Sequence, residues 1–151
     1  VDTMARLFEL KNIVGVKDAT ADLDRVTEQK NKMGKEFIQL SGEDGTALDF
    51  NLKGGSGCIS VTANIAPKLC AEFQEASLSK NNDNLLSKAK EINEKLMPLH
   101  NSLFIESNPS PVKYAASLLK LCTEDVRLPL VKITSSTKEK VKSAMQQAGL
   151  L

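Results

Sequence analysis

The sequence predicts an α/β fold in its first half and an all-helical second half. Three short apolar runs, at 13–17, 37–42 and 57–62, have the length and composition of buried strands. Helical patterns separate these runs, which indicates βαβ units and a parallel sheet. After residue 66 the strand patterns stop, and apolar residues recur at helical spacing instead.

Each element of the first half has a local signal. Residues 1–10 predict a helix that is already under way at Val1, so we expect a piece of a longer chain. Residues 22–34 predict a second helix, with Asp22 as its N-cap and a glycine as its stop. A third short helical pattern, at 45–55, ends in the glycines that lead into the next strand.

The second half predicts several packed helices. Pro67 suits the first turn of a helix. A core-facing stripe then follows at spacings of three and four: Leu85, Ala89, Ile92, Leu96, Leu99 and Leu103. We expect a kink or break at Pro98, a turn at 108–111, and two more helices around 112–119 and 141–148.

Composition excludes several classes of function. The net charge of +1 and the absence of Trp argue against nucleic acid as a partner. No apolar run approaches the length of a membrane span, so no membrane partner is expected. The odd cysteine count, without a CxxC pair, predicts a cytoplasmic chain without disulfides or zinc, and Cys58, Cys70 and Cys122 are interpreted as core residues. The only histidine, His100, is expected to be structural.

Lys17 is the residue with the clearest chemical potential. It ends an apolar run with no turn signal, and it shares one strand face with Ile13 and Gly15. If that face is enclosed, burial favours the neutral amine, which can attack a ketone and form a Schiff base. The alternative is that the side chain simply reaches water at the strand end.

Four motifs in order resemble the dihydrodipicolinate synthase family of pyruvate-dependent class I aldolases and lyases. They read IVGVKDAT, LSGEDGTALDF, GGSGCISVTAN and NPSPVK, with Ser110 where an isoleucine is expected. The resemblance runs along the whole chain but corresponds to the C-terminal half of the family's enzyme. It implies the last three strands of a (β/α)8 TIM barrel in residues 1–77, followed by a small all-helical C-terminal domain in residues 78–151.

The resemblance also implies roles for three residues. Lys17 matches the catalytic Schiff-base lysine, while Gly42 and Ile59 match positions that bind pyruvate. The alternatives are a strand-end turn for Gly42 and a core position for Ile59. Glu43 and Asp44 are interpreted as loop or capping residues rather than metal ligands. Thr62 and Asn64 follow the last strand, and we favour a role as caps of the next helix; the alternative is that they support the residues that contact the substrate.

The implied activity is a lyase of lysine and diaminopimelate biosynthesis that condenses pyruvate with L-aspartate semialdehyde. Two alternatives stay open: a related aldolase acting on sugar-derived keto acids, in the manner of N-acetylneuraminate lyase, or an inactive half barrel. No cofactor or metal is expected. The expected partners are the N-terminal half of the same barrel, which would carry the family's proton relay, and further copies in a dimer or tetramer.

Overall fold

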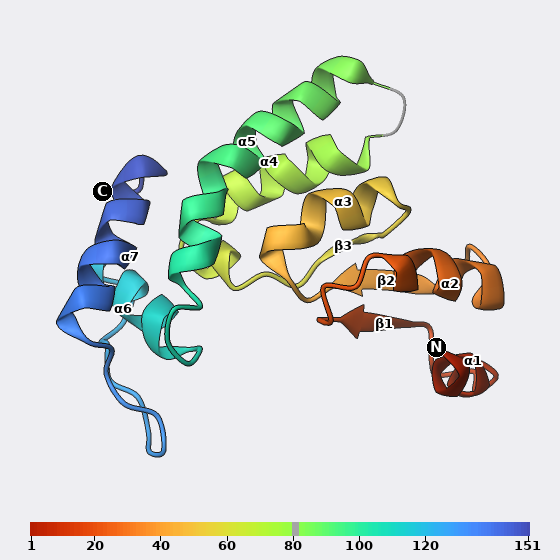
Figure 1. Ribbon diagram of the computed structural model, residues 1–151, viewed down its shortest axis with the longest axis horizontal. Coiled ribbons are helices and arrows are strands. Elements are labelled where there is room, and N and C mark those ends of the chain that lie inside the picture. The colour runs from red at the N-terminus through yellow and green to blue at the C-terminus, as the bar shows by residue number, and fades with distance from the viewer. Residues whose placement is uncertain (80–81) are drawn as a thin grey trace.

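The computed structural model describes residues 1–79 and 82–151. Figure 1 shows an elongated arrangement in which the strands lie toward one end and the last helices toward the other, with further helices between them. The α/β class predicted from the sequence is confirmed, because the described residues contain parallel strands alternating with helices and then helices alone.

The sheet has three strands in the described residues: β1 (Gly15–Asp18), β2 (Ile38–Ser41) and β3 (Gly57–Cys58). They are parallel and lie in the order β1-β2-β3. Lys17 pairs with Leu40, and Leu40 pairs with Gly57. Because neighbours in a parallel register point to the same side, these three residues share one face, hereafter the Lys17 face.

The third strand is shorter than predicted. β3 ends at Cys58, and Thr62–Asn64 form the 3-10 turn η2 instead of continuing the strand. The carboxylate of Asp44 accepts the backbone N–H groups of Val61 and Thr62, at 2.8 and 3.2 Å. Those two groups are therefore not free to extend the ladder.

Short helical segments precede and connect the strands. They are α1 (Asp2–Phe8), α2 (Asp24–Met33), the 3-10 turn η1 (Asp44–Thr46) and α3 (Ala47–Leu52). Gly34 ends α2 as predicted, with a φ of 79° that glycine adopts at little cost. The N-cap of α2 is Leu23 rather than Asp22, although the Asp22 carboxylate still accepts the N–H of Asp24 at 3.1 Å.

Four helices form the second half: α4 (Pro67–Leu78), α5 (Asp83–Ser102), α6 (Ser110–Leu118) and α7 (Ser135–Gln147). Of the kink or break expected at Pro98, the break is wrong, because α5 continues to Ser102. Leu96 and Leu99, on either side of the proline, are fully buried, and their packing holds the helix together across the missing hydrogen bond. No described helix is both long and apolar enough to span a membrane.

One hydrophobic core runs through the helical part. Its largest fully buried side chains come from α5 with its C-cap and from α7, which lie at the centre and far end of Figure 1: Leu96, Leu99, Leu103, Val141 and Met145. The predicted stripe on α5 faces this core, since Ala89, Ile92 and Leu96 are all buried in it. Ala47 of α3 and Ile65 after η2 belong to the same core, so α5 packs directly behind the end of the sheet.

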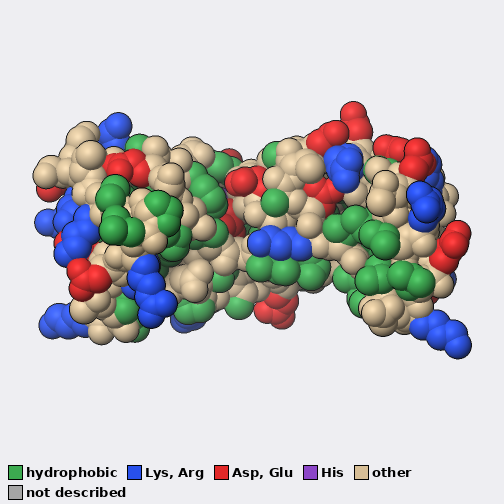
Figure 2. Space-filling view, turned by 90° about the horizontal axis from the view of Figure 1, so that it is seen from below, with side chains coloured by type: hydrophobic (Ala, Val, Ile, Leu, Met, Phe, Trp, Pro, Cys, Tyr) green, Lys and Arg blue, Asp and Glu red, His purple; other side chains and the backbone are tan. Residues whose placement is uncertain are grey.

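The Lys17 face and the opposite face of the sheet differ sharply in exposure. Helices cover the opposite face, where Asp18, Gln39 and Ser41 are buried. On the Lys17 face Ile38 is 44% exposed, and Ile59, directly after β3, is 48% exposed. Figure 2 shows exposed apolar side chains over the end of the molecule that carries the strands, with similar patches over the middle and the opposite end. The Lys17 face is therefore an apolar surface with one amine on it.

A second apolar surface lies on the connection between α6 and α7, residues 119–134, which projects away from the helices in Figure 1. Leu128 is 86% exposed on this connection, and Leu121 and Val131 are 66% and 64% exposed. Apolar side chains this exposed favour contact with another surface.

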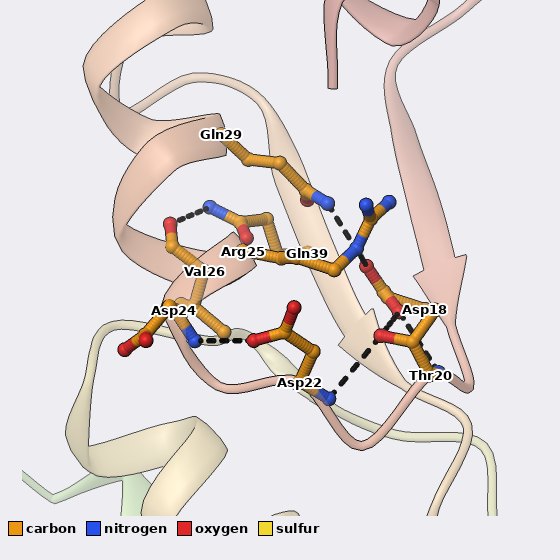
Figure 3. Close-up of polar contacts among 8 residues, drawn as sticks. All are labelled: Asp18, Thr20, Asp22, Asp24, Arg25, Val26, Gln29 and Gln39. Atoms are coloured by element: carbon orange, nitrogen blue, oxygen red, sulfur yellow. Dashed lines mark hydrogen bonds and ion pairs between the residues drawn. The ribbon is translucent and has the colours of Figure 1, made fainter.

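Asp18 anchors the end of β1 to α2 (Figure 3). Its carboxylate accepts the backbone N–H and the hydroxyl of Thr20, the Nε of Arg25 at 2.8 Å and the amide of Gln29 at 2.9 Å. Burial by itself would raise the pKa of Asp18, but these donors outweigh it and hold the pKa at about 2. The anchored carboxylate fixes the position of the preceding residue, Lys17, on the opposite face.

We predict that Asp18→Asn destabilises the chain in a pH-dependent way. The folded pKa of about 2 lies below the ordinary 3.8, so the ionised group stabilises the fold above the ordinary value and loses this effect as the pH falls through the folded one. Urea unfolding followed by circular dichroism should show a loss of about 1–2 kcal/mol at neutral pH.

The same measurement on Asp24→Asn provides the control. Asp24 also carries an ion pair on α2, with Lys53 at 3.2 Å, but its side chain is 95% exposed. Its replacement should cost less than about 0.5 kcal/mol. An Asp18→Asn effect that stays constant in acid, instead of shrinking toward zero, would contradict the ionised anchor.

Candidate active site

Lys17 stands at the carboxyl end of β1, where the side chain is exposed on the Lys17 face. The residues of this chain therefore do not by themselves enclose the amine, which is the condition that the Schiff-base interpretation requires. They do supply its surroundings on one side, because β2 and β3 bring two further predicted site residues to the same end of the sheet.

Gly42 lies against the Lys17 side chain. A Cβ at this position would come 2.8 Å from Lys17 Cε and 2.7 Å from the Cβ of Ala19. The Gly42 N–H donates to the carbonyl of Asp18 at 2.8 Å, which continues the pairing of β1 with β2 by one residue. The absence of a side chain thus gives the lysine the space that it occupies.

Ile59 occupies the corresponding position after β3. Its N–H donates to the carbonyl of Ser41 at 2.8 Å, so the ladder continues by one residue here too. Gly42 follows Ser41 directly, and Ile59 follows Cys58, the partner of Ser41. The three predicted site residues therefore lie at the ends of three adjacent strands, and the exposure of Ile59 shows that it is not a core residue of the described chain.

A cluster of buried and partly buried side chains lies on the other side of these strand ends. We call Asp44, Cys58, Thr62 and His100 the Asp44 cluster; all four are hydrogen-bonded to at least one other member. Asp44, Cys58 and His100 also line a cavity of about 250 Å³ between η1, α4 and α5. Burial, reinforced by the charge of Asp44, raises the pKa of Cys58 to about 12, so Cys58 is a thiol.

His100 joins this cluster from α5. Burial lowers the pKa of His100, although the Asp44 and Glu43 carboxylates oppose the shift. The ring Nδ1 lies 2.7 Å from the hydroxyl of Thr62. His100 is buried, and it connects α5 to the segment that follows β3.

Other predictions meet mixed outcomes. Glu43 caps η1 by accepting the N–H of Gly45 at 3.3 Å, as expected. Thr62 and Asn64 do not cap α4, whose N-cap is Ala66; they form η2, because the Thr62 hydroxyl is taken by His100. All three cysteines are free, and Cys122 is exposed rather than part of the core. Among residues 1–79 and 82–151, no group of three His, Cys, Asp or Glu side chains is placed to hold a metal ion.

Sequence reasoning missed the role of Asp18. The signal was present in KDAT, where an aspartate two residues before a threonine is typical of a side chain that accepts hydrogen bonds from the following turn. Sequence reasoning assigned Asp44 only a local loop or capping role. The hydrogen bonds that its carboxylate accepts from the N–H groups of residues 61 and 62 have no local signal, because they join two connections that are close only after the sheet has formed.

Solved structures share this arrangement. The chain superposes with a TM-score of 0.92 on a dihydrodipicolinate synthase from Acinetobacter baumannii crystallised with pyruvate, at 41% identity. The enzyme from Thermotoga maritima gives a TM-score of 0.91 at 36% identity. Each match covers 99% of this chain and about half of the other, 50% and 51%.

Curated sequences agree. A 4-hydroxy-tetrahydrodipicolinate synthase from Pelagibacter ubique is 66% identical over the full length of this chain, and one from Parvibaculum lavamentivorans is 62% identical. The chain spans about half the length of these relatives, 51% and 50%. The model of the dihydrodipicolinate synthetase family matches residues 1–148. On its fold and on its sequence, the chain belongs to the dihydrodipicolinate synthetase family.

Proposed function

We propose that this chain is the part of a lyase that forms a Schiff base with pyruvate on Lys17 and condenses it with L-aspartate semialdehyde. The observation that carries the proposal is the placement of the Lys17 side chain against the bare backbone of Gly42, at the carboxyl ends of parallel strands. The family and the relatives named for this synthase support the choice of substrates. The reaction belongs to lysine and diaminopimelate biosynthesis, in the cytoplasm.

The chemistry follows from a primary amine beside a small open site. The neutral amine of Lys17 attacks the ketone carbon of pyruvate, and loss of water leaves an iminium. The iminium draws electrons from the adjacent methyl carbon, so that carbon loses a proton and becomes an enamine. The enamine carbon then forms a bond to the aldehyde carbon of the second substrate, whose carbonyl oxygen takes up a proton, and the iminium forms again. Attack on this iminium by the amine of the second substrate or by water releases the product and restores the Lys17 amine. Gly42 and Ile59 would line the pyruvate site, where a glycine allows the substrate to approach the backbone.

The exposed Lys17 face supports a finer proposal for the fold. We place the strands in residues 1–77 as the last three of a (β/α)8 barrel, with residues 78–151 as a helical C-terminal domain. Three strands cannot close a barrel, and the open Lys17 face with Ile38 and Ile59 would pack against the other five. Its partner is therefore the N-terminal half of the same barrel, and the completed unit would assemble into a dimer or tetramer.

Trapping of pyruvate tests the role of Lys17. The complete enzyme can be built by joining this chain to the half of the Pelagibacter ubique relative that it does not cover. Pyruvate followed by borohydride should add a reduced pyruvyl group to Lys17, detected by peptide mass spectrometry. Lys17→Arg should abolish trapping, because arginine stays protonated and cannot form the imine.

Two outcomes would contradict the assignment. One is a folded chimera that traps pyruvate on a lysine other than Lys17. The other is a chimera that traps no pyruvate while the full-length relative does. Product analysis with L-aspartate semialdehyde, compared with sugar-derived aldehydes, then tests the second substrate in the same preparation.

Gly42→Ala should impair Schiff-base formation more than it impairs folding. The new methyl group would meet Lys17 Cε at 2.8 Å and Ala19 Cβ at 2.7 Å, so the flexible lysine must move away. We expect the trapping rate in the chimera to fall about tenfold or more, because the amine is displaced from its attacking position.

Gly45→Ala is the matched control for that measurement. A methyl group there meets only the Glu43 carboxylate at 3.5 Å, an ordinary contact, so trapping should stay within about twofold of the unmodified rate. If thermal stability and trapping fell in proportion for Gly42→Ala, the glycine would be a structural turn residue rather than part of the site.

The 151-residue chain alone should associate and lack condensation activity. Its open strand edges and half-exposed Ile38 and Ile59 favour self-association, and joining it to the missing half should remove this tendency. Size-exclusion chromatography with light scattering, and an assay with both substrates, compare the chain with the chimera. A monomeric, active chain would show that the proposed architecture is wrong.

A further inference from the structure

The loop 59–62, which carries Ile59, is held at both ends by hydrogen bonds. At its first residue, the Ile59 N–H donates to the carbonyl of Ser41 in β2. At its far end, the N–H groups of Val61 and Thr62 both donate to one oxygen of the Asp44 carboxylate. The backbone at Ile59 is therefore placed by contacts with residues on both sides of Gly42.

Asp44 itself is almost completely enclosed. Its exposed fraction is 5%, and its second carboxylate oxygen accepts the thiol of Cys58 at 3.9 Å. A buried carboxylate is costly unless its oxygens are hydrogen-bonded, and most of the bonds that stabilise this one come from the loop 59–62. Asp44 follows Gly42 by only two residues. One side chain thus connects the segment of Gly42 to the segment of Ile59.

Thr62 is the point where the loop is joined to the helical part. Its side chain is fully buried, and the hydroxyl lies 2.7 Å from Nδ1 of His100 in α5. Its carbonyl accepts the N–H groups of Ile65 and Ala66, which lead into α4. Every polar group of Thr62 is therefore engaged, and a shift of the loop would break several bonds together.

We infer that Asp44, Thr62 and His100 are positioning residues for pyruvate. They fix the loop 59–62 relative to Gly42, and so fix where Ile59 meets the substrate on Lys17. This inference rests on the proposed function of Lys17. It gives the helical part a direct role at the site, because His100 lies on α5, more than 80 residues after Lys17 in the sequence.

A positioning role and a merely stabilising role predict different results. If the cluster only stabilises the fold, its loss lowers thermal stability and leaves pyruvate affinity unchanged. If it positions the loop, its loss weakens pyruvate binding in molecules that remain folded. The quantity that separates them is the pyruvate concentration that gives half-maximal borohydride trapping on Lys17, measured below the unfolding temperature.

Variants of Asp44 and Thr62 provide graded changes in the chimera. Asp44→Ala removes the acceptor, and we expect half-maximal trapping to need about tenfold more pyruvate or higher. Asp44→Asn keeps an oxygen that accepts both N–H groups, so the increase should be about threefold or less. Thr62→Val removes only the hydroxyl that meets His100 and should raise the concentration, whereas Thr62→Ser should restore it.

Asn51→Ala is the matched control for lost stability. Asn51 in α3 is 2% exposed, and its amide donates to Gln74 and Ser77 of α4 at 2.9 and 2.8 Å, away from the loop. Its loss should lower the melting temperature and leave the half-maximal pyruvate concentration unchanged. If Asp44→Ala behaved like this control, the positioning role would be refuted.

Hydrogen exchange separates this inference from the proposed function. Measured without pyruvate, the amides of Val61 and Thr62 should be protected in the unmodified chimera and lose protection in Asp44→Ala. Unchanged protection would overturn the inference even if Lys17 traps pyruvate normally. Failure of the unmodified chimera to trap pyruvate, with the exchange pattern as expected, would instead count against the proposed function alone.

Discussion

The parallel register of the three strands is the constraint on which the site depends. Side chains alternate along a strand, so a slip of one residue would turn Lys17 to the helix-covered face and bring Asp18 to the open one. In the observed register Lys17, Leu40 and Gly57 point to the same side. The following residues then place Gly42 against the lysine side chain and Ile59 at the end of β3, paired with Ser41. The amine that we propose as the nucleophile, the gap for its side chain and an apolar residue at the same end of the sheet thus come together through backbone pairing.

Two buried aspartates support this arrangement from the opposite side of the sheet. Asp18 ties the end of β1 to Arg25 and Gln29 of α2, and Asp44 ties the segment after β2 to the loop after β3. Both carboxylates are nearly enclosed and both accept several donors, which is how a buried charge becomes tolerable. The residues on the Lys17 face are therefore held in place by charged hydrogen bonds on the opposite face. The sheet separates the two charged anchors from the Lys17 face, where we propose that pyruvate binds.

The strongest contrast in the molecule is between its two surfaces. The helices α4, α5 and α7 enclose a core in which Leu96, Leu99 and Met145 are fully buried. By contrast, the Lys17 face leaves Ile38 half exposed, and the connection 119–134 leaves Leu128 almost fully exposed. Burial of apolar area is the main driving force of folding, so an exposed apolar surface of this kind favours contact with another protein surface. The relatives are about twice as long as this chain. We propose that the half that this chain does not cover is the partner of the Lys17 face.

Periodicity and local signals determined much of this protein from the sequence. The alternation of strands and helices, the end of α2 at Gly34 and the stripe on α5 follow from patterns a few residues long, and Lys17 was recognisable at a strand end. The short β3, the unbroken helix at Pro98 and the partners of Thr62 were decided only in the tertiary structure. In each case a distant contact outweighed a local preference. The Asp44 carboxylate accepts the N–H groups of Val61 and Thr62, which would otherwise extend β3. Core packing keeps α5 helical across Pro98, and the Thr62 hydroxyl bonds to His100 instead of capping α4. Such contacts join segments that lie together only once the chain has folded, so no local pattern announces them.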